Sequence, residues 1–319
     1  MHARTEHAHK QQVHLAVRLR PDRLMLVKSV QNVRAARHLC FVLLAALFVA
    51  VFESPLAALI RFTVQQENSS YICLIPFISA FLLIRERKTI FSQLETHWCA
   101  GSGLILAGTL LYAVGLGDFV TASTNDRLSV EIFAMIVTSF GGFVLCYGLR
   151  AFRMALFPAL FLCLTVPLPD VVLNRVISWL QTGSAEVSYA GFQFLGVPVF
   201  RIGFIFSLPG VTIEVARECS GIHSSLALLI TALLAGHLFL RTARTRIILI
   251  LVAVPLLIVK NGIRIVTLAL LSIYVDPSFL TGSLHHQGGI VFFLVALGFL
   301  AFALRSLQHL ERSAGPHAV

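Results

Sequence analysis

Long apolar runs constrain the fold of this chain more than any other feature. A transmembrane helix needs about 20 predominantly apolar residues to cross a hydrocarbon core about 30 Å thick. The sequence holds eight candidate runs, of which the second and fifth are short and need tilt, extension or an interfacial position. The runs are 39–60, 70–84, 98–116, 128–148, 154–169, 221–240, 247–271 and 288–305. We therefore predict an all-α integral membrane protein with about eight transmembrane helices.

The charge of the chain supports a lipid environment and predicts its orientation. Only 13% of the residues are charged, whereas a soluble domain carries about 25%. With the N-terminus in the cytoplasm, 18 of the 25 Lys and Arg residues fall on cytoplasmic segments and five fall outside. This bias follows the positive-inside rule and predicts two cytoplasmic termini. The net charge of +10 is therefore explained by membrane orientation, and we expect no nucleic-acid partner.

The same pattern divides the chain into three regions. Residues 1–38 form a basic tail that we expect to be cytoplasmic and disordered, without a cleavable signal peptide. Metal binding is an alternative interpretation of His2, His7, His9 and His14 in this tail. Residues 39–308 form the polytopic membrane domain, and residues 309–319 form a cytoplasmic tail.

Residues 170–218 form the only long segment that we expect outside the membrane. Apolar residues recur at near-helical spacing over 174–195, which predicts either an amphipathic helix along the outer leaflet or a plain loop helix. Apolar residues then alternate over 202–206 and 211–215, with a Pro-Gly turn between them. This alternation predicts a β-hairpin at the membrane surface before the sixth span. A hairpin there could hold an extended peptide by strand addition.

Cys219 lies where the sixth span begins, and its neighbours are polar. A helix N-terminus lowers the pKa of a thiol and favours the nucleophilic thiolate. The alternative is a structural cysteine in a turn of small residues, Ser220 and Gly221. The other five cysteines lie in or beside apolar runs, and the chain has no CxxC or Cys/His spacing suited to zinc. We therefore expect neither a metal nor a cofactor.

Arg264 lies within the seventh predicted span. A central arginine costs at least about 2.5–3.5 kcal/mol on the most lenient insertion scale, so it must face a polar interior. Asn261, one turn earlier on the same helix face, could orient it. The structural alternative is an ion pair of Arg264 with Glu53 or Glu131. Lys260 points elsewhere, so it either snorkels or pairs with one of these acids.

Two histidines precede the last span. His285 and His286 lie in the loop that leads to Gly289, and an imidazole at a membrane boundary can act as a general acid and base. His223 is a competing candidate, because it follows Cys219 by four residues and so shares its helix face. The residues alone do not choose among these three histidines.

Three motifs, in this order on the last three predicted spans, resemble the exosortase/archaeosortase family. They are Cys219-Ser220-Gly221, Asn261-Gly262-Ile263-Arg264, and His285-His286-Gln287-Gly288-Gly289. Segments 74–79, 85–87, 167–169 and 196–198 are also similar, so the resemblance covers residues 39–308. It implies that Cys219 is the nucleophile, that Arg264 stabilises the thiolate or the oxyanion, and that His285, four residues before Gly289, is the acid/base.

The resemblance also implies a substrate and a location. Such an enzyme, in the bacterial inner membrane with its site facing the periplasm, would cleave secreted proteins that end in a short PEP-CTERM-like motif, a transmembrane helix and a basic tail. It would then transfer them to an unidentified acceptor. The alternatives are a protease without transfer activity and a non-catalytic membrane transporter or exopolysaccharide assembly factor. In a transporter, Lys260, Arg264, Glu53 and Glu131 would line a substrate or proton path.

Overall fold

The computed structural model is a helical membrane protein built from two compact units, Met1–Leu168 and Pro169–Val319. It describes residues 21–65, 70–92, 95, 97–117, 123–215, 222–280 and 289–313, with the side chains of 21–34, 70, 223 and 280 left out. The predicted membrane domain 39–308 is therefore divided between two units, each with its own apolar core.

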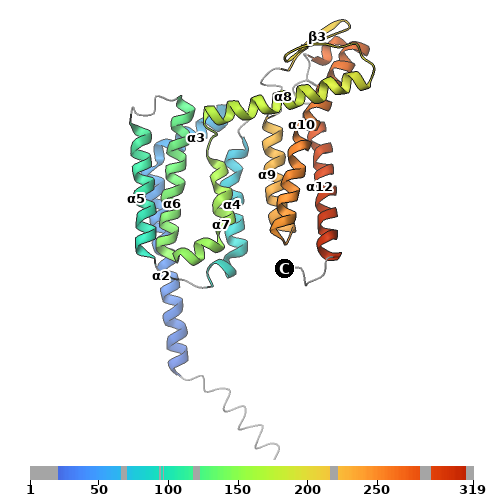
Figure 1. Cartoon of the computed structure of the whole chain (residues 1–319). Helices are drawn as coiled ribbons and strands as arrows, with labels where there is room; N and C mark the ends of the chain where they lie inside the picture. Colours follow the sequence, from blue (N-terminus) through green and yellow to red (C-terminus); the bar gives the residue numbers. More distant parts are fainter. Residues whose placement is uncertain are drawn as a thin grey trace, which may run out of the picture. The chain divides into compact units, whose positions relative to one another are not determined.

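Unit 1 is a set of helices around α6 (Figure 1). Its elements are α2 (Pro21–Val51), α3 (Glu53–Gln65), α4 (Ser70–Ile90), α5 (Trp98–Leu116), α6 (Thr124–Met154), α7 (Leu156–Leu162) and the short η2 (Cys163–Thr165). Glycines let α5 and α6 approach closely. A Cβ at Gly108 would lie 2.2 Å from Thr138 Oγ1, and one at Gly141 would lie 2.7 Å from the Ile105 backbone nitrogen. Small residues at a helix interface are typical of membrane bundles.

The N-terminal part of unit 1 differs from two sequence predictions. Helix α2 begins at Pro21, so part of the tail expected to be disordered is helical; proline is favoured in the first turn of a helix, where its missing N–H costs nothing. The predicted span 39–60 is also interrupted, because α2 and α3 meet at an angle of 71°. Pro55 explains the break, since it has no N–H to donate to the carbonyl of Val51.

Unit 2 places three helices side by side, with α8 lying across them (Figure 1). Its helical elements are α8 (Asp170–Phe194), α9 (Ile222–Phe239), α10 (Ala243–Tyr274), η4 (Pro277–Leu280) and α12 (Gly289–Ser313). A shared apolar core joins α8, α9, α10 and α12 through residues such as Leu180, Leu228, Leu257 and Leu300. Helix α12 runs to Ser313, so it continues beyond the predicted domain boundary at residue 308.

Helices α8 and α10 pack closely where a glycine on one helix faces a larger side chain on the other. A Cβ at Gly183 would lie 2.9 Å from the Ile258 side chain, and one at Gly191 would lie 3.0 Å from that of Val266. Between them, a Cβ at Gly262 of α10 would lie 2.5 Å from Cγ1 of Val187. Spacings of four on both helices indicate that their i, i+4 ridges interlock. The close approach brings the polar side chains of α8 to α10.

A three-stranded antiparallel sheet follows α8. Its strands are β1 (Phe200–Ile202), β2 (Ile205–Leu208) and β3 (Val211–Glu214), in the order β1-β2-β3. Gly210, with φ of 78°, makes the turn between β2 and β3, a backbone conformation that costs glycine little. Alternate side chains of β2 and β3, including Phe206 and Ile213, are buried in a core shared with α8 and α10. The sheet thus rests on α8 and α10 and leads the chain from β3 toward α9.

The helices show that the protein is a multi-pass membrane protein. Within the described residues, α5, α6, α10 and α12 are long and apolar enough to cross a membrane, and the number rises to six if each of two bent helix pairs is one span. Large apolar side chains on these helices, such as Leu106 and Phe299, are exposed, as expected where lipid is the solvent. The all-α membrane fold is confirmed, and the count of eight stays a prediction.

Candidate functional site

The described structure contains only part of the predicted site. Arg264 and Asn261 lie on α10, and Gly289 begins α12. His223 lies in the first turn of α9, but its side chain is among those not described. The remaining predicted residues, Cys219, Ser220, Gly221, His285 and His286, lie outside the described residues. The site is therefore built from α10 and the elements that contact it.

Arg264 is half-buried in the C-terminal half of α10. Because α10 has 32 residues, it is about 48 Å long at 1.5 Å per residue. This exceeds the hydrocarbon thickness of about 30 Å, so a large part of α10 must project beyond the membrane core. Arg264 can therefore lie near the membrane boundary although the helix continues for ten residues beyond it.

Asn261 ties α10 to α8 just before Arg264. It is only 1% exposed, and its Nδ2 donates a hydrogen bond of 2.9 Å to Ser184 Oγ on α8. Ser188, one turn further along α8, lies 2.7 Å from the Ser184 carbonyl of its own helix and 3.3 Å from the Gly262 carbonyl of α10. Buried polar groups of this kind need partners, and the neighbouring helix supplies the partner of Asn261. The contacts fix the rotation of α10 about its axis, and so the direction in which Arg264 points.

Lys260 has a partner that the sequence analysis did not predict. It is 6% exposed, and its Nζ donates to Ser224 Oγ in the first turn of α9. Within unit 1, Glu131 accepts a hydrogen bond of 2.9 Å from Arg127, four residues earlier on its own helix. The alternative pairing of Lys260 with Glu53 or Glu131 stays a prediction.

The two contacts between α9 and α10 define their alignment. Near the connecting loop, a Cβ at Gly236 would lie 3.6 Å from Cδ2 of Leu249; further along, Ser224 meets Lys260. Because residue numbers fall on α9 as they rise on α10, the helices are antiparallel. One turn beyond Lys260, about 6 Å along the axis, α10 reaches Arg264. Helix α9 begins at Ile222, two residues before Ser224.

Gln181 is a residue of this region that the sequence analysis missed as a site candidate. It is 7% exposed on α8, and its Nε2 donates a hydrogen bond of 2.5 Å to the carbonyl of Val215, directly after β3. The sequence held a clue to this contact. Gln181 is a polar residue beside the apolar face of a predicted amphipathic helix, and it lies just before the small residues Gly183 and Ser184. Val215 and Ile222 thus bound the segment 216–221, and each is held in unit 2.

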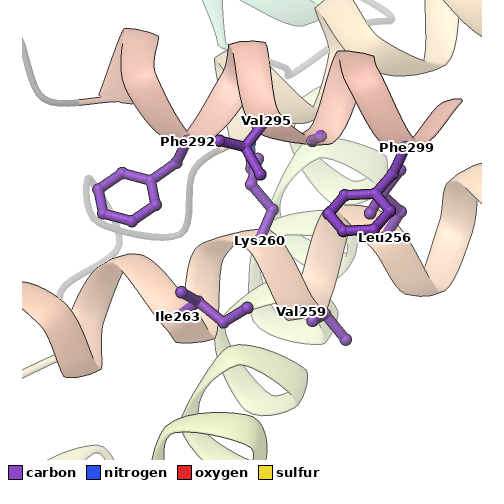
Figure 2. A pocket seen from close by; sticks show the side chains of 8 residues that line it. Leu256, Val259, Lys260, Ile263, Phe292, Val295 and Phe299 are labelled. Carbon is purple, nitrogen blue, oxygen red and sulfur yellow. The ribbon is translucent and has the colours of Figure 1, made fainter. Parts of the chain in front are cut away.

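An apolar groove lies between α10 and α12 (Figure 2). Its volume is about 240 Å³, and Lys260 is the only polar residue in its lining. Figure 2 shows the Lys260 side chain leaving α10 among Leu256, Ile263 and Val295. Because the Nζ atom is bonded to Ser224 of α9, the groove offers apolar surface only, which suits contact with lipid.

The part of the chain that the structure describes holds no group of three or more His, Cys, Asp or Glu side chains able to bind a metal ion. Helix α10 itself carries two charged side chains in its middle, Lys260 and Arg264, and both are cations. The arrangement therefore favours anions, such as a thiolate or an oxyanion, at the Arg264 level.

Comparison with known proteins agrees with the sequence motifs. A family model described as transmembrane exosortase (Exosortase_EpsH) matches residues 63–302 of the chain. No curated protein and no solved structure matches it. The matched range includes most of both units and all three motifs, so the family predicted from the sequence is confirmed.

Proposed function

Because this chain belongs to the transmembrane exosortase family, we propose that it is a membrane cysteine peptidase and transpeptidase. Its substrates are secreted proteins with a C-terminal sorting signal, made of a PEP-CTERM-like motif, a transmembrane helix and a basic tail. It cuts at the motif on the periplasmic side of the inner membrane and transfers the new C-terminus to an acceptor. Cys219, Arg264 and His285 carry the reaction.

One observation supports this assignment most directly, namely the alignment of α9 with α10. Ser224 and Lys260 meet, and Arg264 lies one turn further along α10. Cys219 precedes Ile222 by three residues, a separation that the chain spans with at most about 11 Å. A separation this short allows Cys219 to come within reach of a long guanidinium side chain. Arg264 would then stabilise the Cys219 thiolate or the oxyanion of the intermediate.

The helix that follows Cys219 favours the ionised thiol. Helix α9 has 18 residues, so its length of about 27 Å is close to the thickness of a hydrocarbon core, about 30 Å. Its N-terminus then lies at a membrane boundary, where free N–H groups and the helix dipole attract an anion. A positive partner and a helix N-terminus are the two features that lower the pKa of catalytic thiols.

His285 is the proposed acid and base. It precedes Gly289, the first residue of α12, by four residues, which the chain spans with at most about 14 Å. Helix α12 packs against both α9 and α10, so the loop before α12 can reach the Arg264 level. His286 and His223 are the alternatives for this role, and they are separated by mutation below.

The reaction proceeds in two steps, formation of a thioester on Cys219 and its transfer to an acceptor. The Cys219 thiolate attacks the scissile carbonyl carbon, and Arg264 stabilises the oxyanion of the tetrahedral intermediate. When the C–N bond breaks, His285 gives its proton to the leaving amine, and a thioester remains on Cys219. His285 then removes a proton from the incoming acceptor, which attacks the thioester and releases the Cys219 thiolate. With water as the acceptor the outcome is hydrolysis.

Co-expression with a candidate substrate tests the proposal. A suitable substrate is a secreted protein from the source genome that ends in a shared short motif, an apolar helix and an Arg-rich tail. We expect wild type to shorten this protein and Cys219→Ala to leave it at full length. Processing that continues in Cys219→Ala refutes the cysteine mechanism. The matched control is Cys99→Ala, because Cys99 is an exposed cysteine of α5.

Two further measurements refine the roles. The same assay compares three variants, His285→Ala, His286→Ala and His223→Ala. Only the variant that lacks the acid/base, which we expect to be His285→Ala, should lose processing. Mass spectrometry of the product C-terminus separates transfer from hydrolysis. An added group at the new C-terminus indicates transfer, whereas a free carboxylate indicates a protease.

A further inference from the structure

We infer that Lys260 is a positioning residue for the proposed reaction and acts by holding the first turn of α9 against α10 through Ser224. The inference rests on the proposed function. The juxtaposition that carries it is the hydrogen bond from Lys260 Nζ to Ser224 Oγ, one helical turn from Arg264. It gives a role to a buried lysine that the three-residue mechanism does not use.

The surroundings of Lys260 make a purely structural role a poor explanation. The side chain is 6% exposed and its stem lies among apolar residues of α10 and α12. On α8, the nearby polar residues Gln181 and Ser184 are neutral and are bonded to Val215 and Asn261. Among the described side chains, the charged group nearest in sequence on its own helix is Arg264, which also carries a positive charge. An amine beside a like charge in apolar surroundings is electrostatically unfavourable.

The position of Ser224 explains what such an amine can do. Ser224 is the third residue of α9, so a bond to it fixes the height and rotation of the helix N-terminus relative to α10. The other end of the segment 216–221 is fixed at Val215 by Gln181. Holding the start of α9 therefore sets the distance between Arg264 and Ile222, the first residue of α9. Small displacements of reacting groups are known to cost large factors in rate.

The experiment uses the purified full-length protein in lipid nanodiscs and iodoacetamide as the probe. The rate of alkylation is followed at residue 219 by peptide mass spectrometry as a function of pH. We expect wild type to react as a thiol with an apparent pKa below the ordinary value of about 8.5. Lys260→Met should lower the rate at pH 7 about tenfold and shift the profile to higher pH, because a cation and the anchor of α9 are both lost.

Ser224 variants separate the hydrogen bond from the charge. Ser224→Ala removes the acceptor and should lower the rate at pH 7 by about threefold or more, while Ser224→Thr keeps a hydroxyl and should stay within about twofold of wild type. If the two residues act as a unit, the double variant Lys260→Met with Ser224→Ala reacts no more slowly than Lys260→Met alone. If the fold-loss of the double variant instead equals the product of the two single fold-losses, Lys260 does not act through Ser224, and the inference is overturned.

Controls distinguish positioning from loss of structure. Thr231→Val removes a hydroxyl from α9 that is bonded within its own helix, to the Ala227 carbonyl, and should leave the alkylation rate unchanged. The thermal midpoint of Lys260→Met should equal or exceed that of wild type, because methionine removes a buried amine. A well-folded Lys260→Met protein with the wild-type pH profile overturns this inference alone. An ordinary thiol profile in wild type overturns the proposed function as well.

Discussion

The two units differ in how they hold a buried charged side chain. In unit 1, Glu131 is 8% exposed and accepts a hydrogen bond from Arg127, four residues earlier on its own helix. In unit 2, Lys260 is 6% exposed and donates to Ser224 of the neighbouring helix α9. A pair within one helix leaves the position of that helix free, whereas a bond between two helices fixes their rotation and relative height. We therefore expect the residues that position the proposed reaction to lie in unit 2.

The largest expected effect compares one arginine from each unit. Arg264→Ala should lower substrate processing by about 100- to 1000-fold, the usual loss when an oxyanion donor is removed. Arg127→Ala in unit 1 removes an arginine that pairs with Glu131 at 2.9 Å on its own helix and should leave processing within about twofold. Processing is measured as the first-order loss of full-length substrate in membranes with equal enzyme content. Equal losses in the two variants contradict the division between the units.

A second comparison concerns side chains that bind a backbone carbonyl. Gln181→Leu should lower alkylation at residue 219 about tenfold, because the Val215 carbonyl loses its donor next to the segment 216–221. Ser129→Ala removes the donor to the Pro167 carbonyl of unit 1 and should not change that rate. Iodoacetamide labelling with peptide mass spectrometry measures both. A Gln181→Leu protein that labels like wild type shows that the end of β3 needs no such anchor.

A third comparison sharpens the role of packing in unit 1. Gly108→Ala should destabilise the protein by about 1–3 kcal/mol, because its Cβ would lie 2.2 Å from Thr138 Oγ1 and 2.8 Å from the Thr138 nitrogen. Gly103→Ala on the same helix meets nothing within 4 Å and should be neutral or slightly stabilising. Thermal unfolding in detergent measures both. Equal midpoints for the two variants contradict the close contact of α5 with α6.

The smallest expected effect concerns the end of unit 2 remote from Arg264. Glu311 of α12 accepts hydrogen bonds from the backbone N–H groups of Arg241 and Thr242 and from the Thr245 hydroxyl. Glu311→Gln should destabilise the protein by about 1 kcal/mol, since a carboxylate at a helix N-terminus is favoured over an amide. Glu186→Gln, at an exposed pair with Arg201, should have no measurable effect. High salt screens contacts between fully exposed charges. The difference in stability between Glu311→Gln and Glu186→Gln should therefore persist in high salt.

Parts of the site and fold were predictable for identifiable reasons. Arg264 stood out because an arginine within an apolar run is costly wherever it points, and the motif around it indicated the family. The alternation before Pro209-Gly210 predicted strands because side chains of a strand alternate between faces, and the structure has β2 and β3 on either side of that turn. The break near Pro55 was missed because an apolar run reads as one helix when hydropathy alone is considered.

The sequence by itself determined that this is a membrane protein of the exosortase family, and it predicted a function for Arg264. These conclusions depend on residue types and their order, which the printed chain contains. The tertiary structure alone decided that Lys260 bonds to Ser224 and Gln181 to the Val215 carbonyl, and that the chain forms two units. Such contacts depend on how far each helix is rotated and shifted against its neighbour. Helical periodicity gives the face of a helix but neither its partner nor its height.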